Sequence, residues 1–257
     1  MPIRVTAIVN LKGGVAKTTT TINMAAILAA DYRKRVLIVD ADSQCNATEF
    51  FGVSPQGGNL ALILRGACIQ EEPGVYAANC IRHTNYPGID LLPGDETLMD
   101  MDLSKVESGA VNSNVLRYLV EHVRSKYDYV LIDCPPAFNA ASAAALVAAD
   151  EVIIPIKLDA FSLRGMSNLT RQIKNMRRIN PRLNLAGVLP TMWYKDPQII
   201  AAEYQLRDAG LRVFHHIRRS NKVDAMTFAQ DPLNNSSTHS AACVDYRRFV
   251  TEYVGGK

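Results

Sequence analysis

The feature that most constrains how this chain can fold is a loop rich in glycine and lysine near its N-terminus. The loop runs from Lys12 to Thr19 as Lys-Gly-Gly-Val-Ala-Lys-Thr-Thr, after the apolar segment 4–10 and before a helical pattern over 18–30. Backbone N–H groups at the start of a helix attract anions, and glycines let the backbone approach phosphate groups closely. The succession of strand, loop and helix therefore predicts a binding site for the phosphates of a nucleotide.

The rest of the chain alternates short apolar runs with helical patterns. Strands are expected at 4–10, 35–40, 89–92, 129–133, 151–155 and 185–189. Helices are expected at 18–30, 112–126, 162–178, 198–209 and 241–254. Apolar strands separated by helices indicate a parallel sheet that is covered on both faces. The expected fold is α/β, a doubly wound and mostly parallel sheet of the P-loop NTPase type, in a single domain over 1–257; the stretch 52–88 resists assignment.

Bulk composition excludes several classes of protein. The chain has 257 residues, of which 48% are hydrophobic, which suffices for a sizeable core, but no apolar run approaches the roughly 20 residues that cross a bilayer. The first residues resemble a strand more than a signal peptide, so a cytoplasmic protein is expected. Five dispersed cysteines without a C-x-x-C pair argue against a disulfide framework or a zinc site. The net charge of +3 decides little, but basic residues gather at 171–182 and 207–222, either as solvated helix faces or as a surface that contacts phosphates.

The residue types of the loop indicate how a nucleoside triphosphate with magnesium would bind. The expected phosphate-binding residues are Lys12, Gly13, Gly14, Val15, Ala16, Lys17, Thr18 and Thr19. Lys17 would reach the β- and γ-phosphates, and the Thr18 hydroxyl would ligate magnesium. Asp133, at the carboxyl end of an apolar strand, would hold the same ion through water.

Three motifs together resemble the ParA/MinD family of deviant Walker A ATPases, and the resemblance covers nearly the whole chain. The loop is similar to the family's K-G-G-V-G-K-T-T, with Ala16 as its one departure. Residues 39–48 are similar to the family's second motif, V-D-x-D-x-Q-x-N-x-T, and this motif indicates the ParA branch. Residues 128–136 are similar to the family's Walker B strand. Ala16 adds a methyl group near the phosphates, which should be tolerated if its φ is negative.

This resemblance implies ATP and Mg²⁺ as cofactors and a weak, partner-stimulated hydrolysis of ATP. It implies that Asp42 orients the attacking water, and Asp42 is also a candidate magnesium ligand. For Asp40 we favour the role of a structural carboxylate that caps the loop or supports the metal shell over a direct functional role. Lys12 would cross to the partner's nucleotide in an ATP-bound homodimer, or else serve its own nucleotide; Lys12, Lys17 and Asp42 are thus the catalytic candidates.

The resemblance also suggests where the base and DNA would bind. The family has an I-P-R-N-like loop near adenine, and the matching segment here is 217–221, with arginine in place of proline. The candidate adenine contacts are Arg218, Ser220 and Asn221, and the candidate DNA contacts are Arg218, Arg219, Lys222 and Lys195. Their alternative role is that of an ordinary solvated surface. His215 and His216 stand just before this segment, but no third metal ligand is near them in the motif.

The implied function is partition of a plasmid, a chromosome or a mobile element by an ATPase that associates with the nucleoid. Its partners would be non-specific DNA and a ParB-like protein, and no helix-turn-helix is expected before the first strand. The alternative is a MinD-like positioning ATPase, which needs a basic amphipathic C-terminal helix; the segment 241–254 fits a closing core helix better, so no membrane partner is expected. A third class, related to the nitrogenase iron protein, needs paired cysteines, and Cys134 has no evident second cysteine.

Overall fold

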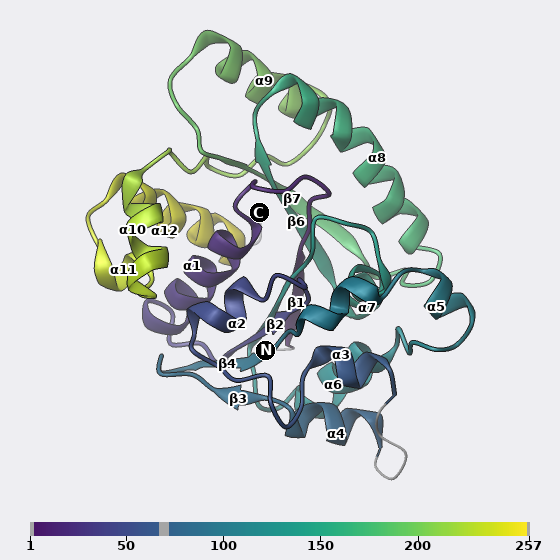
Figure 1. Ribbon diagram of the computed structural model, residues 1–257. Coiled ribbons are helices and arrows are strands. Elements are labelled where there is room, and N and C mark those ends of the chain that lie inside the picture. The colour runs from purple at the N-terminus through teal and green to yellow at the C-terminus, as the bar shows by residue number, and fades with distance from the viewer. Residues whose placement is uncertain (1–2, 67–71, 256–257) are drawn as a thin grey trace.

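A central sheet with helices on both of its faces forms the architecture of the chain, as the computed structural model shows (Figure 1). The structure describes residues 3–66 and 72–255, without the side chains of residues 160–164 and 167. Within these residues no helix is both long and apolar enough to cross a membrane. The α/β fold expected from the sequence is confirmed.

Seven strands build the sheet in the order β3-β4-β2-β5-β1-β6-β7. The strands are β1 (Arg4–Ile8), β2 (Val36–Asp40), β3 (Arg82–His83), β4 (Ile89–Leu92), β5 (Tyr129–Asp133), β6 (Glu151–Lys157) and β7 (Asn184–Thr191). All pairs are parallel except β3 with β4. β1 lies inside the sheet between β5 and β6, so the loop that follows it emerges at the centre of the edge where the parallel strands end.

The helices form two layers, and each layer packs on the sheet through its own hydrophobic core. The layer on one face contains α3 (Leu60–Leu64), α4 (Pro73–Asn79), α6 (Val115–Val123), α7 (Ala140–Ala148) and α8 (Ala160–Met176), with α9 (Pro197–Asp208) at its border. The layer on the other face contains α1 (Lys17–Ala30), α2 (Asn46–Phe50), α10 (Asn221–Ala229), α11 (Leu233–Ser236) and α12 (Ala241–Val254). The short elements η1 (Glu96–Asp100) and α5 (Ser104–Glu107) lie between β4 and α6.

Helix α12 is a core helix, as its sequence pattern suggested. Its large side chains Tyr246, Phe249 and Tyr253 are almost fully buried. The Tyr253 hydroxyl forms a 2.7 Å hydrogen bond with the Thr6 hydroxyl on β1, so the helix is fixed to the sheet. The apolar side chains of α12 are thus used inside the fold.

Several elements escaped sequence analysis. Every residue of α7 is buried, so the helix has no polar face that would reveal a helical period. α3 and α4 lie in the stretch that resisted assignment, and α10 begins at the last residue of the segment 217–221, with only Met226 buried. The expected helix over 112–126 is shorter, because α6 spans only Val115–Val123.

Candidate nucleotide site

The loop after β1 forms a cradle of backbone N–H groups that are available to a ligand. Among the described residues, no N–H from Gly13 to Thr19 donates a hydrogen bond to the protein, whereas the next one, of Thr20, donates to Ala16. The first N–H groups of a helix have no partner within the helix, and here the donors of the preceding glycines are open as well, so the start of α1 offers a row of donors to an anion. The sequence-predicted loop thus has the geometry of a phosphate cradle.

Lys17 lies beneath this cradle and is 93% buried, at 7% exposure. Its Nζ donates to the backbone carbonyl of Lys12 at 3.3 Å, which holds the lysine across the loop. Burial lowers the pKa of Lys17, while the carboxylates of Asp133 and Asp42 oppose this change. Both acidic groups therefore lie close enough to stabilise the ammonium group that would meet the phosphates.

Asp133 ends β5 and is fully buried. Its Oδ1 accepts a hydrogen bond from the Thr21 hydroxyl at 3.4 Å, but its Oδ2 has no partner in the part of the chain that the structure describes. Burial is the main cause that raises the pKa of Asp133, and the Thr18 hydroxyl and Lys17 act in the opposite direction. A buried oxygen without a donor, beside the Thr18 hydroxyl, fits a hard cation such as Mg²⁺.

Asp40 ends β2 directly beside Asp133 in the sheet, but its hydrogen bonds are already used. Its Oδ2 accepts from the backbone N–H and the hydroxyl of Thr48 at 2.8 and 2.7 Å, and its Oδ1 accepts from the N–H of Asp42 at 3.3 Å. The Thr48 hydroxyl in turn accepts from the N–H of Gly94. Asp40 therefore ties together the loop that carries Asp42, which supports the structural role favoured for it.

Asp42 lies in this tied loop at the edge of the cavity. It is 6% exposed, and its Oδ1 accepts the N–H of Gln44 at 3.0 Å, which orients the carboxylate. The cavity has a volume of about 840 Å³, large enough for a nucleotide. Its lining includes Gly13, Gly14, Ala16, Lys17, Thr18, Thr19, Asp42, Gln44, Lys157, Met192, Tyr194, Arg218, Arg219, Ser220, Asn221, Asp224 and Thr227.

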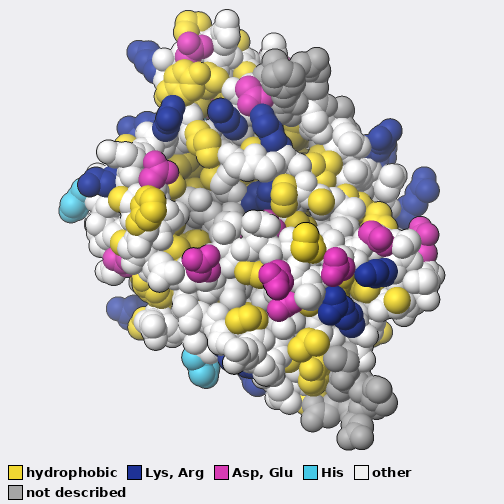
Figure 2. All heavy atoms as spheres, viewed as in Figure 1, with side chains coloured by type: hydrophobic (Ala, Val, Ile, Leu, Met, Phe, Trp, Pro, Cys, Tyr) yellow, Lys and Arg dark blue, Asp and Glu magenta, His cyan; other side chains and the backbone are white. Residues whose placement is uncertain are grey.

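The face that contains the cavity has a row of Lys and Arg side chains above its centre, and both positively and negatively charged side chains lie around the rest of it (Figure 2). Within the described residues no group of three or more His, Cys, Asp or Glu side chains is arranged to hold a metal by itself. Magnesium in nucleotide sites takes few protein ligands, because phosphates and water complete its shell. ATP with Mg²⁺, the cofactors expected from the sequence, fits this site.

Comparison with known proteins identifies the family. A family model described as an AAA domain (AAA_31) matches residues 3–185. The chromosome partitioning protein ParA of Caulobacter vibrioides is 41% identical over 197 residues, covering 75% of this chain and 70% of that protein. The chain belongs to the ParA/MinD family of P-loop ATPases.

Solved structures agree with this membership. Cobyrinic acid a,c-diamide synthase from Mycobacterium smegmatis, with bound ADP and magnesium, is 27% identical with a TM-score of 0.78, covering 97% of this chain and 93% of that one. Apo McdA of Cyanothece is 23% identical with a TM-score of 0.83, covering 98% of this chain and all of that one. At that identity the second likeness concerns the fold alone.

In this ATPase, Lys12 contacts a residue that sequence analysis missed. Its Nζ forms an ion pair with the Asp159 carboxylate at 2.7 Å, directly after β6. The N–H of Lys12 donates to the Asn10 side chain, whose amide donates to the Pro155 carbonyl at 2.7 Å. A single subunit therefore holds Lys12 toward the end of β6, while Lys17 lies in the cradle.

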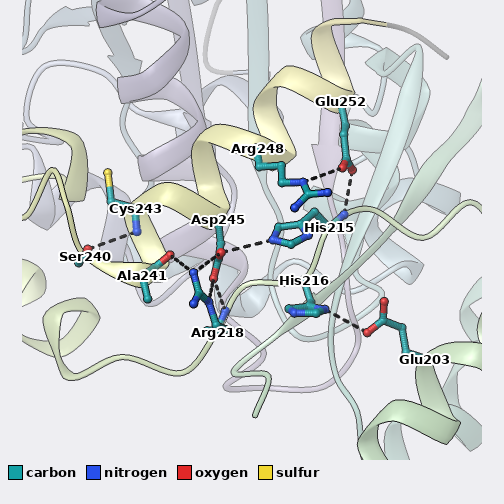
Figure 3. A network of polar contacts seen from close by, with 10 residues as sticks. All are labelled: Glu203, His215, His216, Arg218, Ser240, Ala241, Cys243, Asp245, Arg248 and Glu252. Carbon is teal, nitrogen blue, oxygen red and sulfur yellow. Dashed lines mark hydrogen bonds and ion pairs between the residues drawn. The ribbon is translucent and has the colours of Figure 1, made fainter. Parts of the chain in front are cut away.

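Of the predicted adenine and DNA residues, Arg218, Arg219, Ser220 and Asn221 line the cavity, and Arg218 has a structural partner there. Its Nε and Nη2 donate to the two carboxylate oxygens of Asp245 at 2.8 Å, and its backbone N–H donates to Asp245 at 3.0 Å (Figure 3). Asp245 also contacts the His215 ring, and the His216 ring contacts Glu203. Both histidines are thus engaged by carboxylates, and among the described residues they form no metal site.

The remaining predicted surface residues are less constrained. Arg219, Lys222 and Lys195 are exposed, and Ser220 caps α10 by accepting from the N–H of Lys222 at 3.2 Å. Met192 and Tyr194 also line the cavity, although their sequence carries no signal for that role. Cys134 is fully buried, and burial raises the pKa of its thiol.

The backbone of Ala16 does not have the negative φ that would let alanine replace glycine without strain. Its φ is +65°, in the left-handed region, where the side chain of an L-residue costs about 1–2 kcal/mol and glycine costs little. The condition of a negative φ is therefore not met. The alanine is strained in this loop, so the loop is less stable than a glycine-containing one.

We therefore expect Ala16→Gly to raise the melting temperature of the nucleotide-free protein. Glycine releases the strain at this position, but its greater freedom in the unfolded chain offsets part of the gain. The expected net increase in the free energy of unfolding is up to about 1 kcal/mol, or about 2–4 °C in melting temperature for a chain of this size. Thermal unfolding by circular dichroism measures the shift. Ala201→Gly, in the exposed middle of α9, is the matched control and should lower stability by about 1 kcal/mol; equal losses in both variants would contradict the strain.

Proposed function

We propose that this ATPase hydrolyses ATP, binds DNA without sequence preference as an ATP-bound homodimer, and drives partition of a plasmid, a chromosome or a mobile element. The observation that most supports this function is the row of open N–H groups over Gly13–Thr19, beside which lie the buried Lys17 and the Asp133 oxygen that has no hydrogen-bond donor. The Caulobacter relative is named as a chromosome partitioning protein, which supports the cellular role. A ParB-like protein is the expected stimulating partner.

The geometry supports hydrolysis in which the protein chiefly positions groups and neutralises charge. Mg²⁺, when bound, would neutralise charge on the phosphates, and Asp133 and Thr18 are the residues that would hold it. Lys17 places a buried positive charge against the β- and γ-phosphates. Asp42, oriented by the N–H of Gln44, is at the cavity edge where it can accept a proton from an attacking water.

A dimer is supported by the position of Lys12. The lysine starts the cradle, but its ammonium group is paired with Asp159 and not directed at the phosphate position occupied by Lys17. We infer that Lys12 leaves this pair when two subunits meet and reaches the nucleotide of the partner. A second cation near the phosphates would stabilise charge in the transition state, as an arginine finger does.

DNA binding is supported by three exposed cations, of which Arg219 lines the nucleotide cavity and Lys222 and Lys195 belong to the neighbouring segments. Arg219 and Lys222 flank Ser220 at the start of α10, and Lys195 follows β7. The backbone N–H of Arg219 donates to the Trp193 carbonyl at 2.9 Å, so this segment and the one that carries Lys195 run side by side. A nucleotide in the cavity would thus lie next to the cations that meet the DNA backbone.

Asp42→Ala should retain ATP binding and ATP-dependent dimers but lose turnover by about 100-fold or more, because a positioned general base contributes about 10²–10⁴-fold. Phosphate release measures turnover, and light scattering measures the dimer. Asp224→Ala removes a carboxylate from the α10 side of the same cavity and should leave kcat within about twofold. Normal turnover in Asp42→Ala would refute the role of Asp42.

Arg219→Glu combined with Lys222→Glu should weaken DNA binding in the presence of ATP. It should also reduce the salt dependence of binding, because each phosphate contact that forms releases about one counterion and the variant forms fewer contacts. Affinity is measured on unrelated duplexes with ATP, with ADP and without nucleotide, and ATPase activity without DNA should persist. Arg124→Glu with Lys126→Glu, at the opposite edge of the sheet, matches the charge change. Unchanged DNA affinity would refute the surface; binding to anionic vesicles in place of DNA would favour a MinD-like positioning function.

A further inference from the structure

The last residue of β7, Thr191, reaches across the sheet edge to the phosphate loop. Its hydroxyl donates a hydrogen bond to the Val15 carbonyl at 3.1 Å, although the two residues are 176 positions apart. Thr191 is 2% exposed and lines the nucleotide cavity, and the Val15 side chain is 1% exposed. β7 is the edge strand of the sheet, separated from β1 by β6, so the contact joins the loop to a remote element.

This hydrogen bond fixes the orientation of one peptide group. The peptide between Val15 and Ala16 is planar and trans, so its C=O and its N–H point in opposite directions. With the carbonyl directed at Thr191, the N–H of Ala16 points away from β7 and has no acceptor among the described residues. Ala16 lines the cavity, so this N–H is one of the donors open to a phosphate oxygen.

The same peptide is the one that strain would turn. A flip of the peptide changes ψ of Val15 and φ of Ala16, and Ala16 stands at a φ of +65° that alanine disfavours. Such a flip would relieve the alanine, break the bond to Thr191 and turn the N–H of Ala16 out of the cavity. With glycine at position 16 the peptide would have no such tendency to flip, because glycine adopts positive and negative φ about equally well.

We propose that Thr191 is a positioning residue for the phosphate loop: its hydroxyl holds the Val15–Ala16 peptide in the strained orientation that presents the N–H of Ala16 to a nucleotide phosphate. The inference rests on the proposed function in that the ligand is ATP with Mg²⁺. It assigns to Thr191 an indirect role, since the hydroxyl acts on the loop and not on the nucleotide. It also predicts that Thr191 matters because residue 16 is alanine.

The test measures the affinity for Mg-ATP and Mg-ADP by titration calorimetry in Thr191→Val, which replaces the hydroxyl by a methyl group of similar size. We expect affinity to fall by about tenfold, and Thr191→Ser, which keeps the hydroxyl, to restore it to within about threefold. Thr251→Val, on α12, removes a hydroxyl that also donates to a backbone carbonyl and should not change the affinity. If Thr191→Val does not fold by circular dichroism, Thr191→Ala replaces it.

Combination with Ala16→Gly separates positioning from simple stability. With glycine at 16, loss of the Thr191 hydroxyl should cost at most about threefold in affinity, so the two substitutions are not additive. Equal losses in both backgrounds, or affinity of Thr191→Val within twofold of the parent, would overturn the role of Thr191 while leaving ATP binding in place. A parent protein that fails to bind Mg-ATP in the same titration would refute the proposed function and this inference together.

Discussion

The register between β2 and β5 places Asp40 and Asp133 next to each other at the buried ends of two strands. Two carboxylates taken out of water and held together disfavour their charged forms, and burial raises the pKa of both. The two carboxylates differ in how the cost of their burial is compensated. Asp40 accepts three hydrogen bonds from its own loop, whereas Asp133 keeps one oxygen without a donor.

This difference divides the roles of two residues that look alike in sequence. Since the hydrogen bonds of Asp40 tie Thr48 and Asp42 to the end of β2, Asp40 shapes the loop that carries the water-orienting candidate. Asp133, near Thr18 and Lys17, retains capacity for a cation. The position of the Asp42 loop and the open oxygen at the metal position therefore follow from how this buried pair of carboxylates is compensated.

Support for the phosphate loop comes mainly from the half of the sheet beyond β1. Asn10 is bonded to the Pro155 carbonyl of β6, Lys12 to Asp159 after β6, and Val15 to Thr191 of β7. The loop thus lies over the ends of two strands that follow it by more than 140 positions. A sequence motif shows which residues can bind phosphate, but the contacts that hold a strained residue such as Ala16 in place are spread along the chain.

Much of the fold and the phosphate site was predictable, for identifiable physical reasons. Continuous apolar runs marked the six parallel strands, and the motif from Lys12 to Thr19 marked the cradle, because phosphate binding restricts both residue type and spacing. α7 was not predictable, since a helix buried on every side has no period. The left-handed φ of Ala16 and the contacts of Thr191 and Asp159 depend on tertiary structure, which residue identity does not report.

The rim of the cavity shows how a departure from a family motif can be absorbed by the fold. Proline at position 218 could not donate a backbone hydrogen bond, whereas Arg218 donates to Asp245 from its backbone N–H and from two nitrogens of its guanidinium group. Asp245 is 1% exposed on α12, so the arginine supplies the cation that this buried carboxylate requires. Because Arg218 is held in this ion pair, its charge stabilises the rim of the cavity. The departure thus links the rim of the nucleotide cavity to the core helix α12.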